Sequence, residues 1–185
     1  MEEIRSMWEC VRKDSEIPVV ETARLRLRGH AFEDFEPCAA MWANPQVVKY
    51  TVGKPLSPED VWARILRYAG HWTLLGFGYW AIEEKSTGKF IGEVGFADLK
   101  REMEPSIEGM AEIGWILTPN AHGKGFATEA TRAVIDWGKK HFRQVKTVCI
   151  IDPANIASIR VAEKCGLHEV AQTTYKSMPT ILFEL

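Results

Sequence analysis

The chain has 185 residues, of which 46% are hydrophobic and 26% are charged, and its formal net charge is −2 at pH 7. These values are typical of a soluble globular protein with one domain and a sizeable core, and the slight acidity gives no support for general nucleic-acid binding. Because no apolar run approaches the roughly 18–20 residues of a membrane-spanning helix, and residues 1–5 lack the apolar core of a signal peptide, we expect a cytoplasmic protein without a membrane partner.

The N-terminal third begins with a segment that has no regular spacing of apolar residues. Residues 1–20 show mixed charge and no sustained period, so we interpret them as a mobile or loosely packed arm and residues 21–185 as a single domain. Apolar and charged residues alternate over 22–28, which predicts a half-exposed strand. Apolar residues at helical spacing then predict a helix over 32–43, which ends at Asn44-Pro45.

A second helix begins at Ser57-Pro58, because serine can cap a helix and proline suits its first turn, and we expect it to run to about residue 68. The later elements follow in order: strands over 78–83, 89–96 and 110–117, a helix over 128–141, a strand over 146–151, a helix from Asn155 to about 164, and strands near 169–173 and 180–185. This order predicts an α/β fold with a mixed central β-sheet of about six to seven strands, flanked by helices on both faces.

The most informative segment joins an apolar strand to the helix over 128–141. After Glu112-Ile113-Gly114-Trp115-Ile116-Leu117 and a short polar turn, the chain reads His122-Gly123-Lys124-Gly125-Phe126-Ala127. Two glycines and a helix N-terminus place free backbone N–H groups together, an arrangement that favours a phosphate or pyrophosphate. The spacing fits neither the mononucleotide P-loop nor the three-glycine dinucleotide fingerprint, and a plain strand-to-helix turn is the alternative.

These residues resemble a known family. The strand and glycine loop look like the acetyl-CoA-binding motif of the GNAT superfamily of acyl-CoA-dependent N-acyltransferases. A second match is Asn155-Ile-Ala-Ser158 with Glu163-Lys-Cys-Gly-Leu167, and a third is Thr22-Ala-Arg-Leu-Arg-Leu-Arg28. Together they resemble the ribosomal-protein N-terminal acetyltransferase branch, over roughly residues 20–185. The resemblance implies the GNAT fold and acetyl-CoA as cosubstrate.

The resemblance also implies where acetyl-CoA binds. Its pantetheine arm is expected along the backbone of Ile116 and Leu117, like an added strand, and its pyrophosphate on the amides of the glycine loop. Asn155 is expected to face the pantetheine, while an ordinary helix N-cap is its competing role. The implied cofactor-binding residues are Ile116, Leu117, Thr118, His122, Gly123, Lys124, Gly125, Phe126, Ala127, Thr128, Asn155 and Ser158.

The implied chemistry is direct attack of an amine on the thioester, which needs a base for the amine. We expect Glu112 to be this base, because its predicted face is apolar and burial would raise its pKa. A carboxylate paired with an arginine is the alternative role for Glu112, and Glu93, acting through a water, is the second candidate. The tyrosine that many relatives use as general acid is replaced by Ala162, so Ser158 is the candidate donor to the departing thiolate.

The acceptor remains open at this stage between a protein N-terminal α-amine and a small amine, which the acids of the 99–108 loop could attract. Transfer of another acyl group and a non-catalytic acetyl-CoA sensor are the alternatives, and a homodimer is expected by analogy only. Most aromatic residues should be core, with four near the region where this fold builds its acceptor pocket: Trp42, Tyr50, Trp72 and Phe77.

Neither the cysteines nor the histidines show the sequence spacing of metal ligands, so we expect free thiols and no metal. The cysteines are Cys10, Cys38, Cys149 and Cys165, and the histidines stand at positions 30, 71, 122, 141 and 168.

Overall fold

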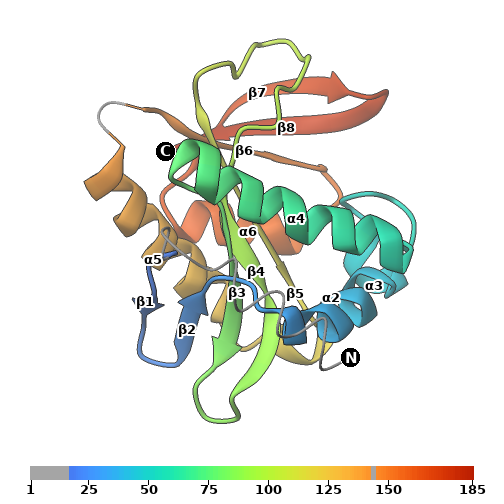
Figure 1. The fold of residues 1–185 in the computed structure, drawn as a ribbon. Helices are drawn as coiled ribbons and strands as arrows, with labels where there is room; N and C mark the ends of the chain where they lie inside the picture. Colours follow the sequence, from blue (N-terminus) through green and yellow to red (C-terminus); the bar gives the residue numbers. More distant parts are fainter. Residues whose placement is uncertain (1–16, 143–144) are drawn as a thin grey trace.

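An open eight-stranded sheet with helices packed on both faces forms the body of the molecule (Figure 1). The computed structural model describes residues 17–142 and 145–185, so most of the predicted arm over 1–20 lies outside the described residues. The last arm residues belong to the fold: the Pro18 carbonyl accepts a hydrogen bond of 2.7 Å from Trp80 Nε1, and Val20 pairs with Leu27. Within the described part, no helix is long and apolar enough to cross a membrane.

The sheet has the order β1-β2-β3-β4-β5-β6-β8-β7. Its strands are β1 (Val20–Glu21), β2 (Leu25–Arg28), β3 (Tyr79–Glu84), β4 (Lys89–Ala97), β5 (Ala111–Leu117), β6 (Thr147–Ile151), β7 (His168–Tyr175) and β8 (Met178–Glu184). The expectation of six to seven strands was one short, because β1 has only two residues and is too brief to show a sequence alternation.

The helices form two groups. On one face lie the 3-10 turn η1 (Phe32–Asp34) and the helices α2 (Phe35–Trp42), α3 (Pro45–Val48) and α4 (Pro58–Leu75). On the other lie α5 (Phe126–His141), which follows the 3-10 turn η2 (Pro119–Ala121), and α6 (Ile156–Lys164) (Figure 1). Alternate residues of β5 serve the two cores: Ile113 and Leu117 pack with α5 and α6, and Ile116 packs with α2 and α4.

The helix boundaries follow local chemistry. Ser57 caps α4 in a reciprocal capping box with Asp60, as the sequence predicts. The helix continues seven residues past the predicted end at 68, because the left-handed residue that stops it is Gly76, with φ +72°. Helix α5 begins at Phe126, two residues earlier than predicted, directly after the left-handed Gly125.

One strand pair matters most for function. β5 and β6 run parallel and pair only through Ala111↔Thr147 and Glu112↔Val148. The neighbouring β4–β5 pairing, by contrast, runs unbroken from Ala97↔Glu112 to Gly92↔Leu117. The C-terminal half of β5 therefore has a partner on one edge only, and the sheet opens between β5 and β6.

Candidate active site

The register of β5 decides which backbone groups face this opening. The amide of Thr118 donates to the Ile91 carbonyl at 2.9 Å, and Ile116 pairs with Glu93. Because backbone direction alternates along a strand, Ile116 turns toward β4, and the groups that face the opening belong to Trp115 and Leu117. Of the two predicted residues, only Leu117 is thus placed at the opening, and its carbonyl accepts a hydrogen bond of 2.9 Å from His122 Nε2.

The glycine loop follows at the end of β5. Residues 122–125 are exposed, and Gly123 and Gly125 have φ +74° and +79°, a left-handed conformation that side chains disfavour. Gly125 occupies the N-cap position of α5, and within the described residues no side chain caps this N-terminus. The first amides of α5 and the positive end of its dipole are therefore presented at the surface beside the opening.

Arg24, before β2, holds this loop in place. Its Nη1 donates to the Lys124 carbonyl at 2.9 Å, its Nε donates to Glu129 Oε2 at 2.7 Å, and its guanidinium lies 4.5 Å from the centre of the Phe126 ring. Burial raises the pKa of Glu129, but hydrogen bonds from Thr22 and Arg24 outweigh that effect and bring this pKa below its usual value. The sequence marks this segment as a motif, yet its role as a brace for the loop needs the tertiary structure.

Glu112 is paired with an arginine from the charged loop. Arg101 Nε lies 2.5 Å from Glu112 Oε2, and Arg101 Nη2 lies 2.7 Å from Oε1. The Glu112 side chain is 11% exposed, and the Arg101 guanidinium also lies 4.8 Å from the ring centre of Tyr175. The alternative weighed for Glu112, a carboxylate held by an arginine, is therefore what the structure contains. A surface cavity of about 550 Å³ is lined by Glu112 and by residues of the loop over 98–108, Arg101 among them.

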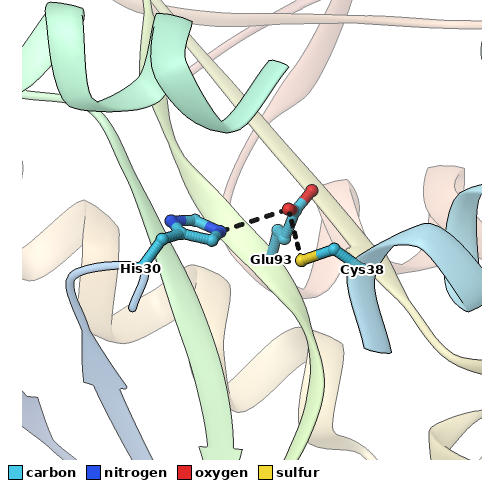
Figure 2. A group of neighbouring side chains, drawn as sticks. All are labelled: His30, Cys38 and Glu93. Atoms are coloured by element: carbon cyan, nitrogen blue, oxygen red, sulfur yellow. Dashed lines mark hydrogen bonds and ion pairs between the residues drawn. The ribbon is translucent and has the colours of Figure 1, made fainter. Parts of the chain in front are cut away.

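Glu93, the second candidate base, is enclosed. Its side chain is fully buried, its Oε2 accepts hydrogen bonds from Trp42 Nε1 at 3.0 Å and the Tyr68 hydroxyl at 3.2 Å, and its Oε1 contacts His30 and Cys38 (Figure 2). Burial raises the pKa of Glu93, but the hydrogen bonds of His30 and Trp42 outweigh burial, so this pKa lies below its usual value. Four partners occupy the carboxylate, so a substrate or water has to displace one to reach it.

Tyr79 lies close enough to feel the charges of both Glu112 and Glu93, and it was not identified as a site residue from the sequence. Its ring stacks on Tyr68 with centroids 4.7 Å apart, and its hydroxyl lies only 2.1 Å from where a Cβ would stand on Gly114. Gly114 leaves the space for this hydroxyl, whereas a Cβ on its β4 partner Gly95 would meet the backbone of Gly78 and Tyr79. A glycine inside the predicted strand over 110–117 was the sequence signal for such a close approach.

The predicted residues of α6 lie in its first turn. Asn155 Oδ1 accepts a hydrogen bond of 3.2 Å from the Ser158 amide, so the expected N-cap role is confirmed. Ser158 is half-buried, and a role for either residue toward acetyl-CoA stays a prediction. Ala162 is fully buried in the core, which shows that this position serves packing here.

The four aromatic residues named for the acceptor region divide into two groups. Trp72 packs against Trp80 and Phe77 packs against Phe142, so these two belong to the core around α5. Trp42 is buried against Glu93, and the Lys49 ammonium lies 4.7 Å from the centre of the Tyr50 ring.

The described cysteines are free thiols, as expected: Cys38, Cys149 and Cys165. Cys10 lies outside the described residues.

Known proteins resemble this chain in sequence and in fold. The family model of the acetyltransferase (GNAT) domain matches residues 24–168. The N-acetyltransferase p20 of Bacillus licheniformis is 31% identical over 141 residues, which are 76% of this chain and 76% of that protein. An acetyltransferase structure from Agrobacterium tumefaciens has a TM-score of 0.79 at 26% identity and covers 94% of this chain and 97% of that one. A spermidine N-acetyltransferase from Vibrio cholerae, solved with CoA and spermine, has a TM-score of 0.69 at 18% identity over 89% of this chain and 96% of that one. The family match includes strand β5, the glycine loop and strand β6. This chain therefore belongs to the GNAT family of acyltransferases.

Proposed function

We propose that this protein transfers the acetyl group of acetyl-CoA to a primary amine by direct attack, without a covalent enzyme intermediate. The observation that carries the proposal is the opening between β5 and β6, which leads directly to the uncapped N-terminus of α5. An extended pantetheine can add to the free edge of β5, and a pyrophosphate can accept hydrogen bonds from the amides of the glycine loop. The V. cholerae spermidine N-acetyltransferase, which was solved with CoA bound, supports this interpretation.

We propose pantetheine contacts at Trp115 and Leu117 rather than at Ile116, because the backbone groups of Trp115 and Leu117 face the opening. A second surface hollow, of about 560 Å³, brings Arg24, Arg132 and Lys164 beside the start of α5. Glu129 and Asp136 line the same hollow and Glu129 pairs with Arg24, so Arg132 and Lys164 are the cations that we propose for the phosphates of CoA.

For the chemistry we propose Glu112 as the proton acceptor, on the same strand as the pantetheine contacts. Both Glu112 oxygens accept hydrogen bonds from Arg101, so an incoming amine has to displace this guanidinium to contact the carboxylate. A cationic amine can replace the guanidinium on this carboxylate and lose its proton there before attack. Ser158 is proposed to donate a hydrogen bond to the departing thiolate. The acceptor is a protein N-terminal amine or a small amine, and we infer a cytoplasmic setting because CoA thioesters are intracellular cosubstrates.

The proposal is tested by titration calorimetry of the purified protein with acetyl-CoA, free CoA and succinyl-CoA, followed by turnover assays with a panel of amines and N-terminal peptides. We expect micromolar acetyl-CoA binding and turnover with at least one amine. Preference for succinyl-CoA would favour a different acyl donor, and tight binding without turnover would favour a sensor. Absence of binding to all three ligands would contradict the proposal.

The glycine loop is tested by Gly125→Val. A β-branched side chain at φ +79° costs about 1–3 kcal/mol and covers the amides, so we expect loss of measurable acetyl-CoA binding. Gly88→Val is the matched control, because Gly88 has φ +66° in the β3–β4 turn and a similar backbone cost away from the site. Equal affinities of the two variants would show that the loop is only a connection.

A further inference from the structure

A cluster of three potential metal ligands lies outside the proposed chemistry. His30 follows β2, Cys38 stands on α2 and Glu93 stands on β4, and their side chains meet under α4 (Figure 2). His30 Nε2 lies 3.1 Å and Cys38 Sγ 3.4 Å from the same atom, Glu93 Oε1, and all three ligand atoms lie within 4.8 Å of one another. Cys38 and Glu93 are fully buried and the His30 side chain is 5% exposed, so bulk water does not compete for these groups.

From this geometry we propose that His30, Cys38 and Glu93 bind one divalent transition-metal ion of the zinc class. Imidazole nitrogen, thiolate sulfur and carboxylate oxygen are the ligands that Zn²⁺ takes, at about 2.0–2.3 Å. An ion at such distances requires ligand atoms roughly 3–4 Å apart. The two separations from Glu93 Oε1, 3.1 Å to His30 and 3.4 Å to Cys38, meet this requirement, and His30 and Cys38 lie within 4.8 Å of each other. Three protein ligands leave a fourth position for water.

The partners of the carboxylate support this assignment. Glu93 uses Oε2 for Trp42 and Tyr68, which leaves Oε1 directed at His30 and Cys38. Metal-binding carboxylates are commonly fixed in this way by hydrogen bonds to the second oxygen.

The charge balance also permits an ion. Binding replaces the Cys38 thiol proton, which leaves to solvent, so the thiolate and the Glu93 carboxylate together neutralise a divalent ion. Arg64 is the opposing charge, with its guanidinium 3.9 Å from the Trp42 ring centre and its Nη1 3.5 Å from the Tyr68 hydroxyl. Arg64 contacts Trp42 and Tyr68 and not the three ligands, so its positive charge weakens cation binding without occupying the site. The ion would tie the segment after β2, helix α2 and strand β4 together.

The test uses the full chain, reduced and freed of metal, titrated with Co²⁺ as a spectroscopic probe and then with Zn²⁺. We expect one Co²⁺ per chain, with a thiolate-to-cobalt charge-transfer band in the near ultraviolet that Zn²⁺ abolishes. Cys38→Ser should lose this band, whereas Cys149→Ser should keep it, because Cys149 is an equally buried thiol on β6. Cys10→Ser should keep it as well.

A second measurement follows the thermal stability of the chain in the presence of metal. At a free Zn²⁺ concentration about 100 times Kd, we expect the Tm of the wild-type chain to rise by roughly 5–10 °C, and that of Cys38→Ser to stay unchanged. If the wild-type chain shows neither the charge-transfer band nor the rise in Tm, or if the band survives in Cys38→Ser, the cluster is a hydrogen-bonded network without an ion and the proposal is overturned. Acetyl-CoA binding is measured in parallel, because this proposal does not rest on it.

Discussion

At the scale of single residues, the two candidate bases differ in what holds them. Glu112 has one charged partner, Arg101, at the rim of a surface cavity, whereas Glu93 is buried with four partners. An incoming amine can exchange with a single guanidinium more readily than with an enclosed network. We therefore propose Glu112 for contact with substrate and Glu93 for internal organisation.

This difference predicts the behaviour of Glu112→Gln. We expect kcat to fall by about 10²–10⁴-fold, because a general base is lost, while the Kd for acetyl-CoA stays unchanged. Arg101→Met is the matched variant: it removes the ion pair but leaves the carboxylate, so kcat should fall far less. Steady-state kinetics with the best amine, together with the pH profile of kcat, distinguish the two. Full activity of Glu112→Gln would move the base to Glu93 or water.

At the scale of elements, the sequence predicts where helices start better than where they end or which side chains meet between elements. The Ser57-Pro58 cap and the Asn155 cap are local chemistry, and both were found. The run from 69 to 75 was missed although Trp72 continues the buried face of α4, because the exposed apolar residues Leu74 and Leu75 obscure the period. The cluster around Glu93 was out of reach, because its ligands lie 8 and 55 residues apart and no short motif contains them.

The brace on α5 carries a pH-dependent prediction. The folded pKa of Glu129 is lowered from 4.5, so its hydrogen bonds with Thr22 and Arg24 stabilise the fold above the unfolded pKa and are lost as pH falls through the folded pKa. We expect Glu129→Gln to lower the free energy of unfolding by about 1 kcal/mol at pH 7. Urea unfolding at a series of pH values should show this difference shrinking below about pH 4.5. A difference that is constant with pH would show that the charge of Glu129 contributes nothing.

At the scale of the whole molecule, the sheet consists of two parts that meet only at the start of β5 and β6. Sequence alternation and turn residues predicted the strands, and the family resemblance implied an exposed backbone edge at Ile116 and Leu117. The register that turns Trp115 and Leu117 toward it came from the structure, because a one-residue shift leaves the apolar pattern of β5 nearly unchanged.

This register predicts a pattern of amide protection. Acetyl-CoA should slow hydrogen exchange at the amides of Trp115 and Leu117, because pantetheine becomes their acceptor on the open edge. The Ile116 amide, already directed to β4, serves as the internal control and should change little. Exchange measured with residue resolution, with and without acetyl-CoA, distinguishes these positions. Protection at Ile116 alone would contradict the assigned register.

The ring of Tyr79, lying over Gly114, has an evolutionary consequence. A Cβ at position 114 would stand 2.1 Å from the Tyr79 hydroxyl, so even alanine there forces the tyrosine to move or to be replaced. The two positions lie on β3 and β5 with β4 between them. Related sequences should therefore vary at 79 and 114 together, with a side chain at 114 only where a smaller residue stands at 79.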